Sequence, residues 1–91
     1  SSDLEAYLLS MFLYQIRNLI KIRDLMEKRN SYSQLVKLSG LHPFVVRKVF
    51  WQAKKFSLEK LKSMYQRLLE IEIGLKIGQI EPRLGLTLFI E

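Results

Sequence analysis

The sequence contains no cysteine, and only one histidine and two prolines among its 91 residues. Without cysteine the chain forms no disulfide, carries no reactive thiol and offers no thiolate ligand to zinc, and a single histidine cannot make a histidine cluster. No apolar run approaches the roughly 20 residues that a membrane-spanning helix needs. These absences exclude disulfide scaffolds, thiol chemistry and a bilayer-spanning segment.

What is present is typical of a folded domain. Hydrophobic residues make up 48% and charged residues 26% of the chain, which disfavours disorder. The length suffices for one hydrophobic core and predicts a single domain over residues 1–91. Because the sequence begins with two serines and no methionine, we expect a piece of a longer protein. The net charge of +6 favours acidic partners such as nucleic acid.

The pattern along the chain predicts an all-α fold, a compact bundle of about five helices with short connections. Dipeptides typical of hairpin turns are absent, and Pro and Gly stand where helices would end. The expected helices cover residues 3–29, a short segment from Ser31 or Ser33 to Gly40, Pro43 to Lys55, Ser57 to Lys76, and a last segment from Glu81-Pro82 onwards.

The first expected helix is apolar on more than one side when successive residues are stepped by about 100°. One arc contains the core candidates Leu4, Leu8, Met11, Phe12, Leu19, Ile22 and Met26. A second strip consists of Leu9, Leu13 and Ile20. Two apolar sides predict a central helix or one that contacts another chain, and we assign the second strip to a candidate subunit interface.

The later helices have single apolar faces. In the helix over 43–55 the expected core residues are Val46, Val49, Phe50 and Ala53, and in the helix over 57–76 they are Leu58, Leu61, Met64, Tyr65, Leu68, Ile71 and Leu75. Glu72 and Lys76 have the order favoured for an ion pair one turn apart. Gly74 and Gly78 have the spacing of close helix packing in membranes, but Lys76 between them favours packing within a soluble bundle.

No pattern for catalysis or cofactor binding appears. His42 stands beside Pro43 at a helix start, which indicates a structural role. Glu70 and Glu72 point to different helix faces, and a glycine-rich phosphate loop is missing. We therefore expect no catalytic residue, no cofactor, no metal site and no enzymatic activity.

The helices on either side of Gly40 outline a helix-turn-helix, whose second helix enters the major groove in DNA-binding proteins. The candidate DNA contacts are Arg47, Lys48, Lys54 and Lys55. Base reading needs polar residues early on that helix, whereas this one begins with Pro43, Phe44, Val45 and Val46. Tyr14, Phe44 and Trp51 suit base stacking, but aromatic residues at helical spacing more often belong to a core or a protein interface. DNA binding is thus the alternative to a protein-contact function.

The run from Gln34 to Lys48, and above all the segment Gly40, Leu41, His42, Pro43, Phe44, Val45 and Val46, resembles the C-terminal domain of the delta subunit of the bacterial DNA polymerase III clamp loader. The similarity continues through residues 52–61 and 75–82 and back to residues 15–22, nearly the whole chain. The last helix of this family is usually rich in leucine and alanine, whereas here it contains Gly85 and Thr87, which are poorer helix formers.

The resemblance implies a clamp-loader collar-type domain containing a helix-turn-helix-like unit. Such domains assemble side by side into a ring of five subunits, so the implied partners are the gamma/tau and delta prime subunits through collar contacts. It further implies that the sliding clamp is contacted by an N-terminal region absent here, and DNA by the assembled complex, in the cytoplasm and without a membrane partner. The implied function is oligomerisation that supports clamp loading in DNA replication.

Overall fold

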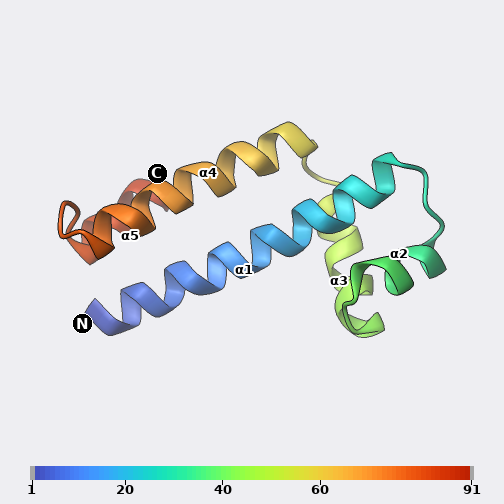
Figure 1. Ribbon diagram of the computed structural model, residues 1–91, viewed down its shortest axis with the longest axis horizontal. Helices are drawn as coiled ribbons and strands as arrows, with labels where there is room; N and C mark the ends of the chain where they lie inside the picture. The colour runs from blue at the N-terminus through green and yellow to red at the C-terminus, as the bar shows by residue number, and fades with distance from the viewer. Residues whose placement is uncertain (1, 91) are drawn as a thin grey trace.

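The computed structural model describes residues 2–90, which form five α-helices without a strand in that range (Figure 1). They are α1 (Ser2–Glu27), α2 (Tyr32–Ser39), α3 (Pro43–Ala53), α4 (Leu58–Lys76) and α5 (Pro82–Ile90). The predicted all-α fold is confirmed.

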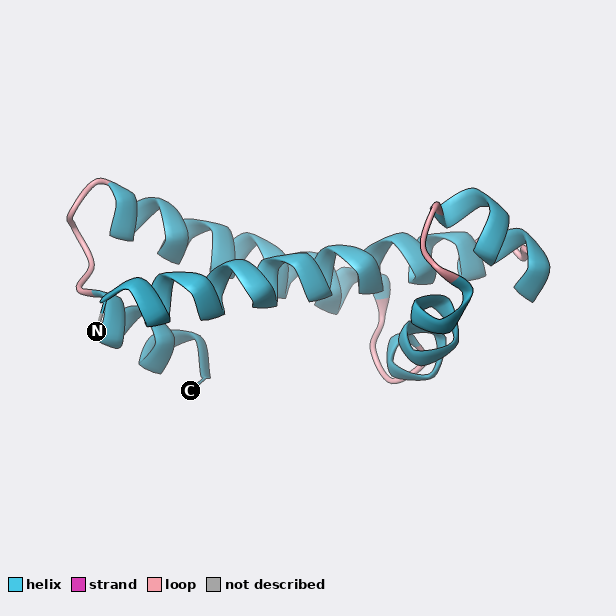
Figure 2. Ribbon diagram, turned by 90° about the horizontal axis from the view of Figure 1, so that it is seen from below, coloured by secondary structure: helices cyan, strands magenta, loops and turns pink. Residues whose placement is uncertain are grey.

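Helix α1 is the axis of the molecule and contacts each of the other helices. Its 26 residues span about 39 Å at 1.5 Å per residue, close to the longest dimension of the fold, 43 Å. Helices α4 and α5 lie beside its N-terminal half, and α2 and α3 lie at its C-terminal end (Figures 1 and 2). The molecule is therefore elongated, with 23 and 19 Å in the other two directions.

Buried side chains form two clusters that meet along α1. The first cluster joins α1 to α4 and consists of Leu9, Leu13, Ile16, Leu68 and Ile71. The second cluster joins α1 to α2 and α3 and consists of Ile22, Leu35, Val46, Val49 and Ala53. The core residues expected on α3 and α4 are buried or partly buried, as predicted.

The expected core arc of α1 needs a correction. Leu4 and Met11 are 57% and 37% exposed, whereas Ile22 on the same arc is fully buried. Phe12 on this arc packs against the first cluster, with its ring centroid 5.5 Å from that of Phe89 in α5, whereas Leu19 and Met26 pack against the second cluster. Periodicity identified an apolar side but not how much of its length a neighbouring helix covers.

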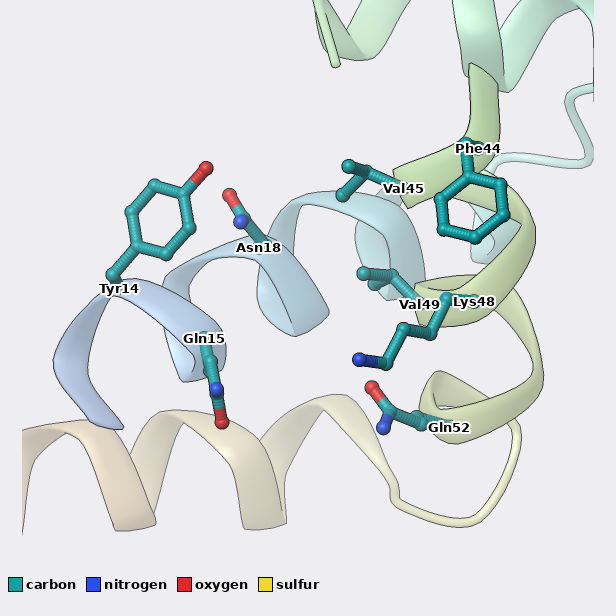
Figure 3. A pocket seen from close by; sticks show the side chains of 8 residues that line it. All are labelled: Tyr14, Gln15, Asn18, Phe44, Val45, Lys48, Val49 and Gln52. Carbon is teal, nitrogen blue, oxygen red and sulfur yellow. The ribbon is translucent and has the colours of Figure 1, made fainter. Parts of the chain in front are cut away.

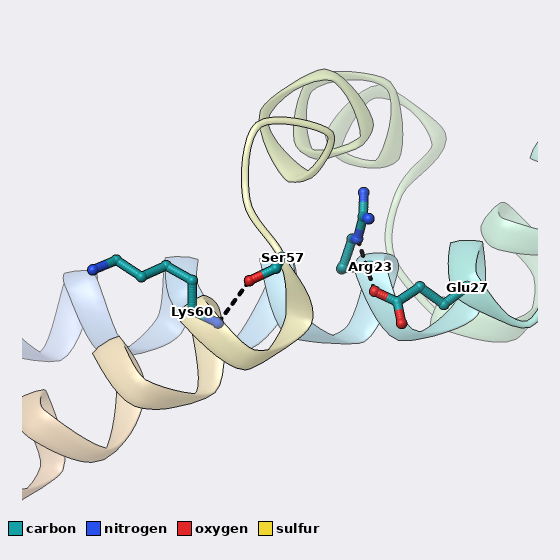
Figure 4. Close-up of polar contacts among 4 residues, drawn as sticks. All are labelled: Arg23, Glu27, Ser57 and Lys60. Atoms are coloured by element: carbon teal, nitrogen blue, oxygen red, sulfur yellow. Dashed lines mark hydrogen bonds and ion pairs between the residues drawn. The ribbon is translucent and has the colours of Figure 1, made fainter.

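Side-chain caps set most helix starts. Between the two serines considered for α2, Ser31 is the N-cap: its Oγ accepts from the Gln34 backbone N–H at 3.3 Å. The Gln34 Oε1 in turn accepts from the Ser31 N–H at 2.7 Å, which completes a capping box. Ser57 caps α4 in the predicted way, accepting from the Lys60 N–H at 3.0 Å (Figure 4).

Two helices end earlier than predicted. Helix α1 stops at Glu27 because Arg29 adopts a left-handed conformation with φ 62°, two residues inside the expected boundary at 29. An ion pair between Arg23 and Glu27, with Nε and Oε2 3.1 Å apart, lies in its last turn (Figure 4). Helix α3 stops at Ala53, so Lys54 is its C-cap and Lys55 lies beyond it.

Two glycines let α5 and its connection pack closely onto α4. A Cβ added at Gly74 would lie 2.5 Å from Ile80 Cδ1, and one at Gly85 would lie 2.9 Å from Ile71 Cγ2. Gly74 thus has the packing role predicted for it, while Gly78 has a left-handed φ of 76° in the turn. The Arg67 Nη2 donates to the Leu88 carbonyl at 2.6 Å and ties α5 down. The predicted Glu72–Lys76 pair also forms, at 3.6 Å.

Within residues 2–90, no helix combines the length and the apolarity that crossing a bilayer requires.

Candidate interaction surface on the first and third helices

The strip assigned to a subunit interface is covered by the chain itself. Leu9 and Leu13 are 0% and 6% exposed, and Ile20 packs, partly buried, against the same first cluster. Helices α4 and α5 occupy this side of α1. Leu9 and Leu13 are therefore core residues of this chain and not surface that a second subunit could contact, and Ile20 is partly covered by the same cluster.

The other side of α1 carries an exposed apolar row, here named the α1 stripe: Leu4, Tyr7, Met11 and Tyr14. Their spacing of three, four and three residues keeps them on one helix face. Exposed fractions run from 37% at Met11 to 61% at Tyr7. The spacing was visible in the sequence. It was missed because Leu4 and Met11 were assigned to the core and the two tyrosines were not counted with them.

The same side of α1 continues under α3, which places α3 beside the end of the stripe. The left-handed Gly40, with φ 71°, ends α2, and His42 then caps α3 by accepting the Phe44 backbone N–H on Nδ1 at 3.1 Å. His42 thus has the structural role predicted for it. Leu41 packs against the second cluster, and Pro43 opens the helix. The turn between α2 and α3 therefore orients α3.

Helix α3 exposes aromatic and basic side chains together. Phe44 and Trp51 are 73% and 62% exposed, and Arg47 and Lys48 lie between them around a shallow hollow. The four predicted DNA contacts, which include Lys54 and Lys55, are all exposed. The Lys54 ammonium lies 4.6 Å from the ring centroids of both Phe50 and Trp51, so it already contacts one face of the Trp51 ring.

A pocket of about 250 Å³ separates α1 from α3 (Figure 3). Val45 and Val49 supply apolar lining from α3, and Tyr14 and Phe44 stand at its rim. The polar groups that line it are the side chains of Gln15, Asn18, Lys48 and Gln52.

Asn18 is the unusual member of the pocket. It is 6% exposed as a residue, and no hydrogen bond joins its amide to another of the described residues. Its amide atoms are not among the buried unpaired atoms of the described residues, so water in the pocket reaches them, and Figure 3 shows the amide on the Tyr14 side of the pocket.

Metal binding and a carboxylate site find no support in this surface. Within residues 2–90, no three histidine, aspartate or glutamate side chains gather closely enough to hold a metal ion. Nor is any of the eight pocket-lining residues acidic. What the surface offers is apolar contact, hydrogen-bond donors and positive charge.

Comparison with known proteins agrees with this geometry. Residues 4–91 match the family described as DNA polymerase III delta subunit, C-terminal domain. Among solved structures, the DNA clamp loader delta protein of Bacillus subtilis superposes with a TM-score of 0.86 at 25% sequence identity over 93% of this chain. The chain spans 25% of the length of that protein. A comparison with curated proteins finds no match.

Proposed function

Because the chain belongs to the family formed by the C-terminal domains of DNA polymerase III delta subunits, we propose that it is the oligomerisation (collar) domain of a clamp-loader delta subunit. In this role it supports assembly of the complex that loads the sliding clamp onto DNA. It performs no chemistry itself, and its partners are the neighbouring clamp-loader subunits of the gamma/tau and delta prime type.

The observation that carries the proposal is the α1 stripe. Leu4, Tyr7, Met11 and Tyr14 continue a helix side that is buried further along, where α2 and α3 cover Ile22. Over the N-terminal half of α1, no helix within residues 2–90 covers this side in the same way. Contiguous exposed apolar residues mark protein-contact sites, and tyrosine and methionine are enriched in interfaces. A helix of a neighbouring subunit would bury this half as α3 buries the other.

The test uses the full-length delta subunit with the other clamp-loader subunits of its source organism. A variant with Leu4→Ser, Tyr7→Ser and Met11→Ser is expected to lose the complex in size-exclusion chromatography with light scattering. The matched control changes three residues of similar exposure on other helices at the same end of the fold, Ile73→Ser and Ile77→Ser at the end of α4 and Leu84→Ser on α5, and is expected to assemble.

Circular dichroism of both variants checks that helix content is retained. Normal assembly of the stripe variant would contradict the proposal, as would loss of assembly in the control alone.

The alternative function, duplex reading by the helix-turn-helix, has less support in the geometry. The first turn of α3, which would meet base edges, presents Phe44 and Val45 instead of side chains that form hydrogen bonds with bases. What favours DNA is the exposed basic set Arg47, Lys48, Lys54 and Lys55, and a titration with duplex across salt concentrations tests it, because phosphate contacts weaken steeply as salt rises.

A further inference from the structure

The pocket between α1 and α3 adjoins the α1 stripe, since Tyr14 belongs to both. We propose that this pocket is a docking site for an acidic segment of a neighbouring protein subunit, which inserts an apolar side chain against Val45 and Val49 and pairs its carboxylates with Lys48 and Arg47. The inference rests on the assembly function proposed above and names the chemistry of the partner.

Charge is the first argument. Helix α3 and its C-terminal extension, residues 43–55, contain four basic residues and no acidic one. Arg47 and Lys48 are exposed, and neither forms an ion pair within the described chain. Lys48 lines both the pocket and the neighbouring hollow that also contacts Arg47. A carboxylate is the protein group that complements such a pair of cations.

The polar lining is the second argument. The Asn18 amide forms no hydrogen bond within the described chain, and it lines the pocket together with the side chains of Gln15 and Gln52. Each of these amides offers both a donor and an acceptor, and a peptide backbone complements both. The pocket is thus suited to main chain together with side chain.

The aromatic residues favour protein over single-stranded nucleic acid. Base binding uses free aromatic faces as stacking platforms, but the Lys54 ammonium already lies over the Trp51 ring. Phe44 and Tyr14 stand at the rim of a pocket whose apolar lining is two valines. Aromatic rims around an apolar pocket with a few polar groups are typical of protein-interface anchors.

The direct experiment is zero-length carbodiimide cross-linking, which joins an amine to a carboxylate. It is applied to the assembled complex of full-length delta subunit and partner subunits, followed by peptide mass spectrometry. Lys48 is expected to be linked to an aspartate or glutamate of another subunit, while Lys62, exposed on α4, is not. Absence of any inter-subunit link from Lys48 in the complex would overturn the proposal.

Charge reversal gives the energetic test. The Arg47→Glu, Lys48→Glu variant is expected to raise the Kd for the partner subunits by about tenfold or more, with a weaker salt dependence than the unchanged protein. The control Lys60→Glu, Lys62→Glu, an equal change of charge at exposed positions of α4, is expected to leave the Kd within about twofold. Unchanged affinity of the Arg47→Glu, Lys48→Glu variant would contradict the docking inference. If the α1 stripe variant nevertheless lost assembly, the proposed function would stand and only the docking inference would fail.

Asn18→Leu tests the amide itself. Because water reaches this amide in the free chain, the substitution is expected to leave the urea midpoint nearly unchanged, yet to weaken subunit binding severalfold because the inserted backbone loses its partner. Unchanged binding would show that nothing pairs with Asn18. If a (dT)20 oligonucleotide instead protects Lys48 from carbodiimide and the charge-reversal variant loses only oligonucleotide binding, the surface is a nucleic-acid site and the docking proposal fails.

Discussion

The two halves of the molecule are held together by different means. At the N-terminal half of α1, two long helices lie side by side and bury the leucines and isoleucines of the first cluster, with α5 packed on top. At the other end, α2 and α3 are only 8 and 11 residues long, lengths at which an isolated helix is marginal in water. There the fold adds local polar bonds: the capping box at Ser31, the His42 cap, and a bond from Lys21 Nζ to the Ser39 carbonyl at 3.3 Å.

The comparison shows that apolar burial stabilises the half with long helices, whereas capping bonds add stability to the half with short helices. Where helices are long, apolar contact along their length is enough to hold them in place, and the few backbone groups at their ends contribute little to the stability of the fold. Where helices are short, their ends are a large part of their backbone groups, so each cap stabilises a larger share of the element. The same contrast applies to exposed surface: the first half presents an apolar row, and the second half presents aromatic residues with cations.

The largest expected effect is in the first cluster. Leu9→Ala in the 91-residue chain removes a fully buried side chain and is expected to lower the free energy of unfolding by about 2–5 kcal/mol. Urea denaturation followed by circular dichroism measures it. Tyr7→Ala, two positions away and 61% exposed, is the control and is expected to change stability by about 0.5 kcal/mol or less. Similar losses for both would mean that α1 is rotated relative to the arrangement described here.

The contact of α5 with α4 comes second. Gly85→Leu places a side chain where even a Cβ lies 2.9 Å from Ile71, and overpacking of this kind costs about 1–3 kcal/mol. Thermal unfolding detects it as a lower Tm. Thr87→Leu, at an exposed position of the same helix, serves as the comparison and should leave Tm nearly unchanged. An unaltered Tm for Gly85→Leu would show that α5 does not pack on α4 in this way.

The third largest effect is expected at the cap of α2, where Ser31→Ala should lower the free energy of unfolding by about 1 kcal/mol. The reason is loss of the bond from the Gln34 N–H to the Ser31 Oγ. Urea denaturation again provides the measurement, and Ser33→Ala is the matched variant because Ser33 was the other serine considered from the sequence. A larger loss from Ser33→Ala than from Ser31→Ala would place the helix start two residues later.

The smallest effect belongs to the surface ion pair of α4. Glu72→Gln removes the contact of the Glu72 Oε1 with the Lys76 Nζ. It is expected to lower the free energy of unfolding, measured by urea denaturation, by about 0.2–0.5 kcal/mol, since ion pairs one turn apart contribute little. The difference should shrink in about 1 M salt, which screens exposed charges. Glu70→Gln, exposed on the same helix with no ion pair in the described chain, controls for loss of charge. A loss that persists undiminished in high salt would argue against an ion-pair origin.

Much of the fold followed from local patterns. Ser57, Gly40 and Pro43 mark helix boundaries that the structure confirms, because capping, left-handed φ and the fixed φ of proline act within a few residues. The errors at the ends of α1 and α3 are small. They arise where a residue such as Arg29 takes an uncommon left-handed conformation that its residue type does not indicate.

The candidate site was predictable in its residues but not in its arrangement. Phe44, Trp51 and the basic residues of α3 were identified from the sequence, and all of them are exposed. The pocket was not anticipated, since it brings α1 residues 14–18 against α3 residues 44–52. Asn18 had no distinguishing signal in the sequence, because only the packing of α3 against α1 places its amide at this pocket.

The sequence by itself determined that α1 has two apolar sides, since side-chain direction follows from the 3.6-residue repeat alone. How much of each side became core was decided by the tertiary structure. Helix α4 runs along α1 and covers Leu9 and Leu13, whereas α3 crosses α1 near its C-terminal end and covers Ile22 but leaves Tyr7 and Met11 exposed. The exposed stripe therefore results from the different directions in which helices pack on the two sides of α1, a property of the packed chain that no single helix contains.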